Sequence, residues 1–214
     1  MNRMTKKWIL ISIIAVLILT FSACGKERSD TASPAGSDQG TSQPVADTTE
    51  TDTSSDGENV LVVYFSATGT TEDIAKKIAT ITGADIYEIR AEQEYTDDDL
   101  NWHDSSSRTS IEQNDNSVRP AIGSDTISLD GYTTIYIGYP IWWGEEPRIM
   151  DSFVESYDFD GITMIPFCTS SSSGIGRSGK NLEENAGSSK WLDGKRFGAG
   201  ATETEISRWI DSLN

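Results

Sequence analysis

The chain is short of cysteine, histidine and basic residues, and each shortage narrows what the protein can do. Its 214 residues include two Cys and one His, so no Cys/His cluster has the spacing of a zinc site. Lys and Arg total 17 against 34 Asp and Glu, which gives a formal net charge of −17. Phosphate backbones and anionic lipid headgroups attract basic surfaces. We therefore expect no nucleic-acid partner and no membrane binding by surface charge.

The N-terminal segment, residues 1–23, has the pattern of a secretory signal peptide. Three basic residues precede an apolar run over 8–19, and the small residues Ser22 and Ala23 close the segment. The apolar run of about twelve residues is shorter than the ~20 that a membrane-spanning helix needs. A permanent membrane span is the alternative interpretation.

Cys24 follows the signal segment directly. The residues Phe21-Ser22-Ala23-Cys24 resemble a bacterial lipobox, in which the thiol receives a diacylglycerol and cleavage makes the cysteine the new N-terminus. An ordinary signal peptide followed by an unmodified Cys is the alternative. Acylation would leave Cys168 as the remaining thiol, so no internal disulfide could form. We expect a cell-membrane location on the extracytoplasmic face, with contact to the membrane through the lipid anchor only.

A polar tether and a folded domain are expected after the lipid anchor. Residues 24–57 consist of the lipidated Cys and a Ser/Thr/Asp-rich stretch with only four apolar residues. So few apolar groups cannot offset the entropy lost on folding, which predicts a disordered tether. Residues 58–214 are then the domain, long enough to bury roughly 70% of the surface of its unfolded chain.

Five segments predict the strands of this domain. They cover residues 60–65, 85–90, 133–139, 162–168 and, more weakly, 195–200. The first is an unbroken Val-Leu-Val-Val-Tyr-Phe run, typical of a strand buried on both faces of a parallel sheet. Helical patterns separate the strands, and this alternation predicts an open α/β sheet with right-handed crossovers. Ligands bind such sheets at the carboxyl ends of the strands.

Capping signals locate the clearest helices. Apolar residues at helical spacing after residue 70 predict a helix that stops at Gly83. Pro147 can open another helix as its first residue. Thr202 and Glu205 form a capping box for the last helix.

Two segments give weaker signals. Residues 175–187 are polar and only weakly helical. Residues 92–130 are expected to hold one helix and long loops, with the aspartates at 97–99 able to cap that helix and Arg119-Pro120 ending it. Trp102 and His103 lie in this segment. Each could touch a ligand, although a lone His is more often solvated or structurally bonded.

Three loops that follow predicted strands are the candidate binding segments. They contain Ser66, Ala67, Thr68, Gly69, Thr70 and Thr71; then Pro140, Ile141, Trp142, Trp143 and Gly144; then Cys168, Thr169, Ser170, Ser171 and Gly174. The first loop combines hydroxyls with a helix N-terminus, which can hold a phosphate without Lys or Arg. It lacks the lysine of a Walker loop and the glycines of a G-x-G-x-x-G loop. A polar helix cap without a ligand is the alternative.

The other two loops suit a flat ring. Adjacent tryptophans at a strand end favour a planar heteroaromatic guest, with core packing or a protein contact as the alternative. The Ser-rich third loop can bring backbone N–H groups close to a ligand, or it can be a flexible turn. Cys168 is read as a small buried hydrophobe more readily than as a redox group.

Together these loops favour a ligand with one phosphate and one large flat ring. With this combination of loops the chain resembles the flavodoxins. The resemblance covers residues 59–213 and is closest to flavodoxin-like bacterial proteins with a Y-P-x-W-W-G segment. It implies a flavodoxin-like three-layer α/β fold, with helices on both faces of a parallel sheet of strand order 2-1-3-4-5. It also implies FMN, with its phosphate in the first loop and its ring between the second and third.

An FMN-binding electron-transfer protein is therefore the expected function. Flavin performs the redox chemistry itself, so no catalytic side chain and no metal ligand are assigned. Its partners would be redox proteins or small electron donors and acceptors. An NAD(P)H-dependent FMN reductase is one alternative, although no second nucleotide motif is visible. A non-catalytic FMN-binding or scaffold lipoprotein is the other.

Overall fold

The computed structural model describes residues 59–187 and 189–213. The predicted signal peptide, the lipid attachment at Cys24 and the tether up to residue 57 all lie outside these described residues. Within the described ranges, none of the helices combines the length and the apolarity that crossing a bilayer requires.

The domain is built on one parallel sheet. Its strands are β1 (Val60–Phe65), β2 (Asp85–Ile89), β3 (Thr134–Pro140), β4 (Thr163–Thr169), β5 (Lys190–Trp191) and β6 (Lys195–Phe197). The order is β2-β1-β3-β4-β5, with β6 also paired to β4, which confirms the predicted order 2-1-3-4-5. The chain moves outward from β1 in both directions, so the β1/β3 boundary is the switch point where α/β sheets bind ligands.

The last strand differs from the prediction. A single strand over 195–200 was expected, whereas two short strands, β5 and β6, pair with successive parts of β4. Pro166 of β4 lies between the two paired stretches and has no N–H to give to a neighbour. A Cβ on Gly194 would lie 2.6 Å from the Pro166 carbonyl oxygen, so the chain passes this point without a side chain.

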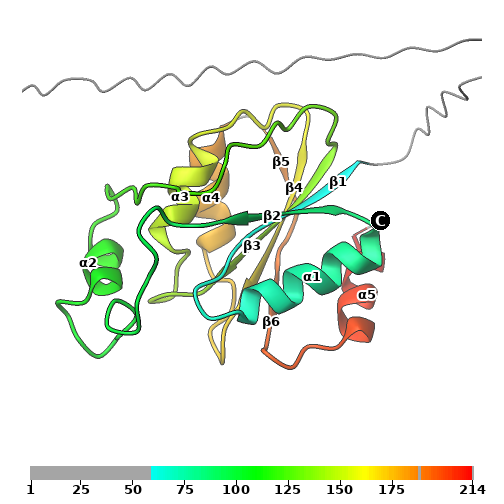
Figure 1. The fold of residues 1–214 in the computed structure, drawn as a ribbon. Coiled ribbons are helices and arrows are strands. Elements are labelled where there is room, and N and C mark those ends of the chain that lie inside the picture. The colour runs from blue at the N-terminus through cyan, green and yellow to red at the C-terminus, as the bar shows by residue number, and fades with distance from the viewer. Residues whose placement is uncertain (1–58, 188, 214) are drawn as a thin grey trace, which may run out of the picture. The chain divides into compact units, whose positions relative to one another are not determined.

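Helices cover both faces of the sheet (Figure 1). On one face lie α1 (Thr70–Thr82) and α5 (Glu203–Asp211), and on the other lie α3 (Arg148–Val154) and α4 (Ser178–Ala186). Two apolar clusters follow from this arrangement, because alternate residues of each strand point to opposite faces. Val62 and Tyr64 pack with α1 and α5, while Leu61 and Val63 pack with α3 and α4.

The helix ends agree with the capping signals, with one shift. Gly83 ends α1 in a left-handed conformation at φ 69°. The Thr202 side chain accepts a hydrogen bond from the Glu205 N–H, as the capping box predicts. Pro147 is the residue before α3 and not its first residue, because its ψ of 140° is extended. The weakly predicted α4 is a full helix that buries Leu182.

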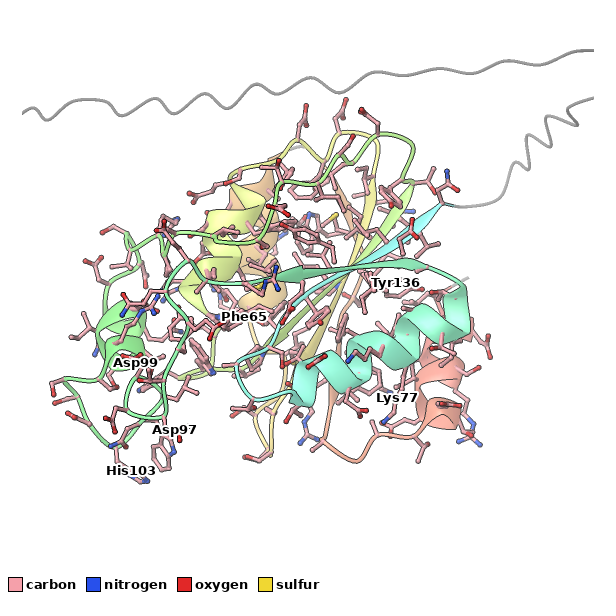
Figure 2. All side chains as sticks on the ribbon, viewed as in Figure 1. Phe65, Lys77, Asp97, Asp99, His103 and Tyr136 are labelled. Atoms are coloured by element: carbon pink, nitrogen blue, oxygen red, sulfur yellow. The ribbon has the colours of Figure 1, made fainter. Side chains whose placement is uncertain are left out.

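Segment 92–130 contains a single helix, α2 (Arg108–Asn114), and long loops. Ser107 caps α2, so the aspartates at 97–99 do not. Asp99 instead accepts hydrogen bonds from the N–H and the hydroxyl of Thr96, which closes a separate turn. Figure 2 shows Asp97, Asp99 and His103 on the loops beside α2.

Candidate functional site

A cavity of about 320 Å³ lies at the carboxyl ends of β1, β3 and β4. This volume is within the ~300–1,000 Å³ range of small-ligand and cofactor sites. Its lining residues come from four segments: Ser66, Ala67, Thr68, Thr70 and Thr71; Pro140, Ile141, Trp142 and Trp143; Thr169; and Leu100, Trp102 and Thr109. The structure therefore brings parts of all three predicted loops to one place.

The loop after β1 presents unpaired donors to the cavity. Gly69, the residue before α1, has φ 83° and gives the helix no side-chain cap. The first N–H groups of a helix have no partner within it, so those of α1 stay available. The Ser66 hydroxyl is buried and has no hydrogen-bond partner among the described residues. Donors of this kind, beside the positive end of a helix dipole, are suited to a phosphate.

Hydrogen bonds hold the three loops together. The hydroxyls of Thr71 and Thr169 lie 2.8 Å apart and join the first turn of α1 to the end of β4. The Ile141 N–H donates to the Thr169 carbonyl at 2.9 Å, which joins the end of β4 to the segment after β3. The convergence of the loops is therefore built into the protein before any ligand arrives.

The two tryptophans have different environments. Trp142 packs edge-on against Phe65 and Tyr95, with ring centroids 5.5 and 5.3 Å away. The Trp143 side chain is 47% exposed. Trp142 therefore braces the segment against the core, while Trp143 is the ring with a free surface to offer a ligand.

Trp143 occupies a strained backbone position. The Trp142 N–H donates to Glu145 O at 2.9 Å, and the Glu145 N–H donates to Trp142 O at 3.0 Å. Within this turn Trp143 has φ 51° and Gly144 has φ 90°. Positive φ is rare for a bulky side chain, and such strain is concentrated at functional sites.

A side-chain amide and a buried ionic cluster support the turn. The Gln113 side-chain amide donates to the carbonyls of Trp142 and Glu146, both at 3.1 Å. The Glu146 carboxylate accepts from Asn181 and lies 3.5 Å from the Arg148 guanidinium. Burial outweighs these partners and raises the pKa of Glu146 to about 7. Burial likewise raises the pKa of Asp151, which also faces Arg148.

The third loop contributes less surface than predicted. Thr169 lines the cavity, whereas Ser170, Ser171 and Gly174 lie outside its lining. Cys168 is completely buried below the loop, and burial raises the pKa of its thiol to about 12. This environment matches a small core residue. Gly69 and Gly144, also outside the lining, shape the turns beside it.

Three further lining residues come from outside the three candidate loops, and of these only Trp102 had been named as a residue that could touch a ligand. Leu100, Trp102 and Thr109 come from the loops and helix of segment 92–130. The Thr109 hydroxyl donates to the Asp99 carbonyl at 2.6 Å, which fixes the approach of α2. Trp102 is 67% exposed and stacks on His103. An aromatic residue in a strongly polar segment was the one available signal.

An open parallel sheet with a ligand-sized cavity at its switch point defines an α/β protein of the flavodoxin-like class. The flavodoxin family model matches residues 59–213, and the chain belongs to the flavodoxin family. This confirms the family resemblance read from the loops.

The chain is also similar to several solved structures. A proposed flavoprotein from Bacteroides uniformis is 46% identical, with a TM-score of 0.69 over 72% of this chain and 99% of that one. A second from Bacteroides eggerthii is 41% identical, with a TM-score of 0.68 over 72% and 97%. A flavoprotein from Lactobacillus acidophilus, at 21% identity and a TM-score of 0.56 over 72% and 99%, shares the fold. No curated protein matches the chain.

Proposed function

We propose that the protein binds FMN and works as an electron-transfer flavoprotein. The observation that carries the proposal is the buried, unpaired Ser66 hydroxyl in the loop between β1 and α1, in a cavity that also exposes Trp143. A phosphate would accept a hydrogen bond from the Ser66 hydroxyl, and a flat ring would cover the exposed side chain of Trp143. The fold relative from Lactobacillus acidophilus was crystallised in complex with FMN.

The residues divide between the two ends of the ligand. Ser66, Thr68 and the first N–H groups of α1 would hold the phosphate. Trp143 would cover the ring, with Trp142 holding the turn in place. Bound FMN supplies one- and two-electron transfer, and the protein supplies orientation and electrostatics. The net charge of −17 disfavours adding negative charge to the ring, so the potential should fall below that of free FMN.

The proposed location is the extracytoplasmic face of the cell membrane, through a lipid on Cys24. The lipobox-like residues before Cys24 support this part of the proposal. Cells grown with a labelled fatty acid should incorporate the label into the full chain and recover it with the membranes. Cys24→Ser should abolish both. Membrane recovery without label would contradict the lipid anchor.

A titration of the purified full chain with FMN and with riboflavin tests the binding proposal. FMN should bind with quenched flavin fluorescence and more tightly than riboflavin, because riboflavin lacks the phosphate. Bound flavin should then be reduced by dithionite and reoxidised by an added one-electron acceptor. Failure of both flavins to bind would exclude the function. Binding without reversible reduction would leave only a flavin-binding protein.

A further inference from the structure

Arg196 binds the third loop, residues 168–174, through hydrogen bonds from its guanidinium. It lies on β6, directly beside Cys168 of β4 in the pairing register. Its Nη2 donates to the carbonyls of Ser170 and Ser171, at 2.6 and 2.5 Å. Its Nε donates to the Ser170 hydroxyl at 3.2 Å. One guanidinium thus holds two successive peptide groups of the loop.

These contacts fix the direction of the loop's N–H groups. The C=O and N–H of a trans peptide unit point in opposite directions. Because the carbonyls of Ser170 and Ser171 face Arg196, the N–H groups of Ser171 and Ser172 face away from it. Among the described residues, no backbone carbonyl accepts from either N–H.

The sheet order shows what lies in that direction. β6 flanks β4 on one side, and β3 flanks β4 on the other. The cavity extends from Thr169, at the end of β4, toward the segments after β3 and β1. At the end of β4 the Ser170 N–H donates to the Phe197 carbonyl of β6, whereas the Thr169 carbonyl accepts from the Ile141 N–H after β3. The side of the loop that faces away from β6 is therefore the side on which the cavity lies.

Arginine is suited to this task and lysine is not. Its planar guanidinium presents several donors in a fixed fork and stays charged at any working pH. A lysine ammonium keeps the charge but lacks the fork. None of the residues that line the cavity is Lys or Arg, and the chain has a net charge of −17. Arg196 therefore also supplies a positive charge near a cavity that has none in its lining.

We infer that Arg196 is a positioning residue for the flavin ring. It holds the third loop so that the N–H groups of Ser171 and Ser172 meet the polar, carbonyl-bearing edge of the ring. The inference rests on the proposed function and deepens it, because it names the residue that holds the third loop at the ring end of the ligand.

FMN and riboflavin titrations of Arg196 variants of the full chain test the inference. R196Q should weaken the binding of both flavins by the same factor, about 10- to 100-fold, which corresponds to one or two lost hydrogen bonds. The midpoint potential of bound flavin should also fall, because the reduced ring loses its donors and a nearby cation. R196K should lose less affinity, since it keeps the charge and can reach one carbonyl.

Lys195→Gln is the matched control. Lys195 is the preceding residue on β6 and its ammonium faces the Phe197 ring, so this variant removes one positive charge without touching the loop. It should leave both affinities unchanged and shift the potential less than R196Q does.

Each outcome decides the inference. Wild-type affinity for both flavins in R196Q, or in R196K where R196Q does not fold, overturns it. A loss for FMN alone also overturns it, because the loop would then serve the phosphate. A wild-type chain that binds neither flavin overturns the proposed function and, with it, the role of Arg196.

Discussion

The loop at 66–69 and the turn at 142–145 line the same cavity, but they are held in place by different forces. The first runs directly into α1 and leaves its donors unpaired. The second has a non-glycine residue at positive φ and is supported by Gln113 and a buried ionic cluster. One loop keeps unpaired donors beside a helix N-terminus, whereas the other is a strained turn supported by its neighbours.

Removing the exposed tryptophan should have the largest effect. Trp143→Ala takes away the ring that would cover the flavin, and stacking on an aromatic side chain contributes about 1–3 kcal/mol. FMN and riboflavin should both bind about 10- to 100-fold more weakly in fluorescence titrations. Ile111→Ala is the control, since Ile111 is 55% exposed but lies outside the cavity lining. Unchanged binding would mean that Trp143 is not the stacking ring.

The ionic cluster should make the turn sensitive to pH. Because the pKa of Glu146 is about 7 in the folded protein and ordinarily 4.5, the native state binds a proton between these values that the unfolded chain releases. The free energy of unfolding therefore falls as pH rises from about 4.5 to about 7. Glu146→Gln should remove most of this fall, on the order of 2 kcal/mol, in urea unfolding at pH 5 and pH 8.

Glu155→Gln provides the matched comparison for this pH dependence. A hydrogen bond from the Arg119 guanidinium lowers the pKa of Glu155, so its contribution to stability is present above pH 4.5 and lost as pH falls. This variant should lose stability at pH 8, whereas Glu146→Gln should gain it. Equal changes in the two variants would contradict the role of burial at Glu146.

Removal of the Ser66 hydroxyl should change FMN affinity and the stability of the ligand-free protein in opposite directions. Ser66→Ala should weaken FMN binding about tenfold and leave riboflavin binding unchanged, because the hydroxyl meets only the phosphate. The ligand-free protein should become more stable by about 1 kcal/mol, since an unsatisfied buried hydroxyl is removed. Thr80→Ala, on α1 but outside the cavity lining, should change neither flavin's affinity. Equal losses for both flavins would contradict the phosphate assignment.

The smallest expected effect is the release of strain in the turn. Trp143→Gly should raise the free energy of unfolding of the ligand-free protein by about 1 kcal/mol, because glycine adopts positive φ without a Cβ clash. Trp143→Ala keeps the Cβ and should show no such gain. A gain of equal size in both variants would place its origin in side-chain exposure and not in the backbone.

The fold was largely predictable because its signals are local. The apolar run at 60–65, the stop at Gly83 and the cap at Thr202 each depend on residues close in sequence. The break between β5 and β6 was not, because it depends on Pro166 and Gly194 meeting across the sheet. The start of α2 was also missed, since Asp99 and Ser107 carry equally good capping side chains.

The site was predictable only in part, because some of its signals are local in sequence and others depend on packing between distant segments. The strand ends predicted that the loops after β1 and β3 meet at one edge of the sheet, and both line the same cavity. Sequence could not show which tryptophan faces outward, because that depends on the packing of Trp142 against Phe65 and Tyr95. The sequence also could not show that Trp102 lines the cavity or that Arg196 contacts the third loop, because both residues are distant in sequence from those loops.

A crystal structure of the full chain with FMN tests the central claim most directly. The account predicts the phosphate within hydrogen-bond distance of the Ser66 hydroxyl and the ring against Trp143, with its polar edge toward the N–H groups of Ser171 and Ser172. FMN bound elsewhere on the domain, or bound here with the phosphate away from Ser66, would contradict it.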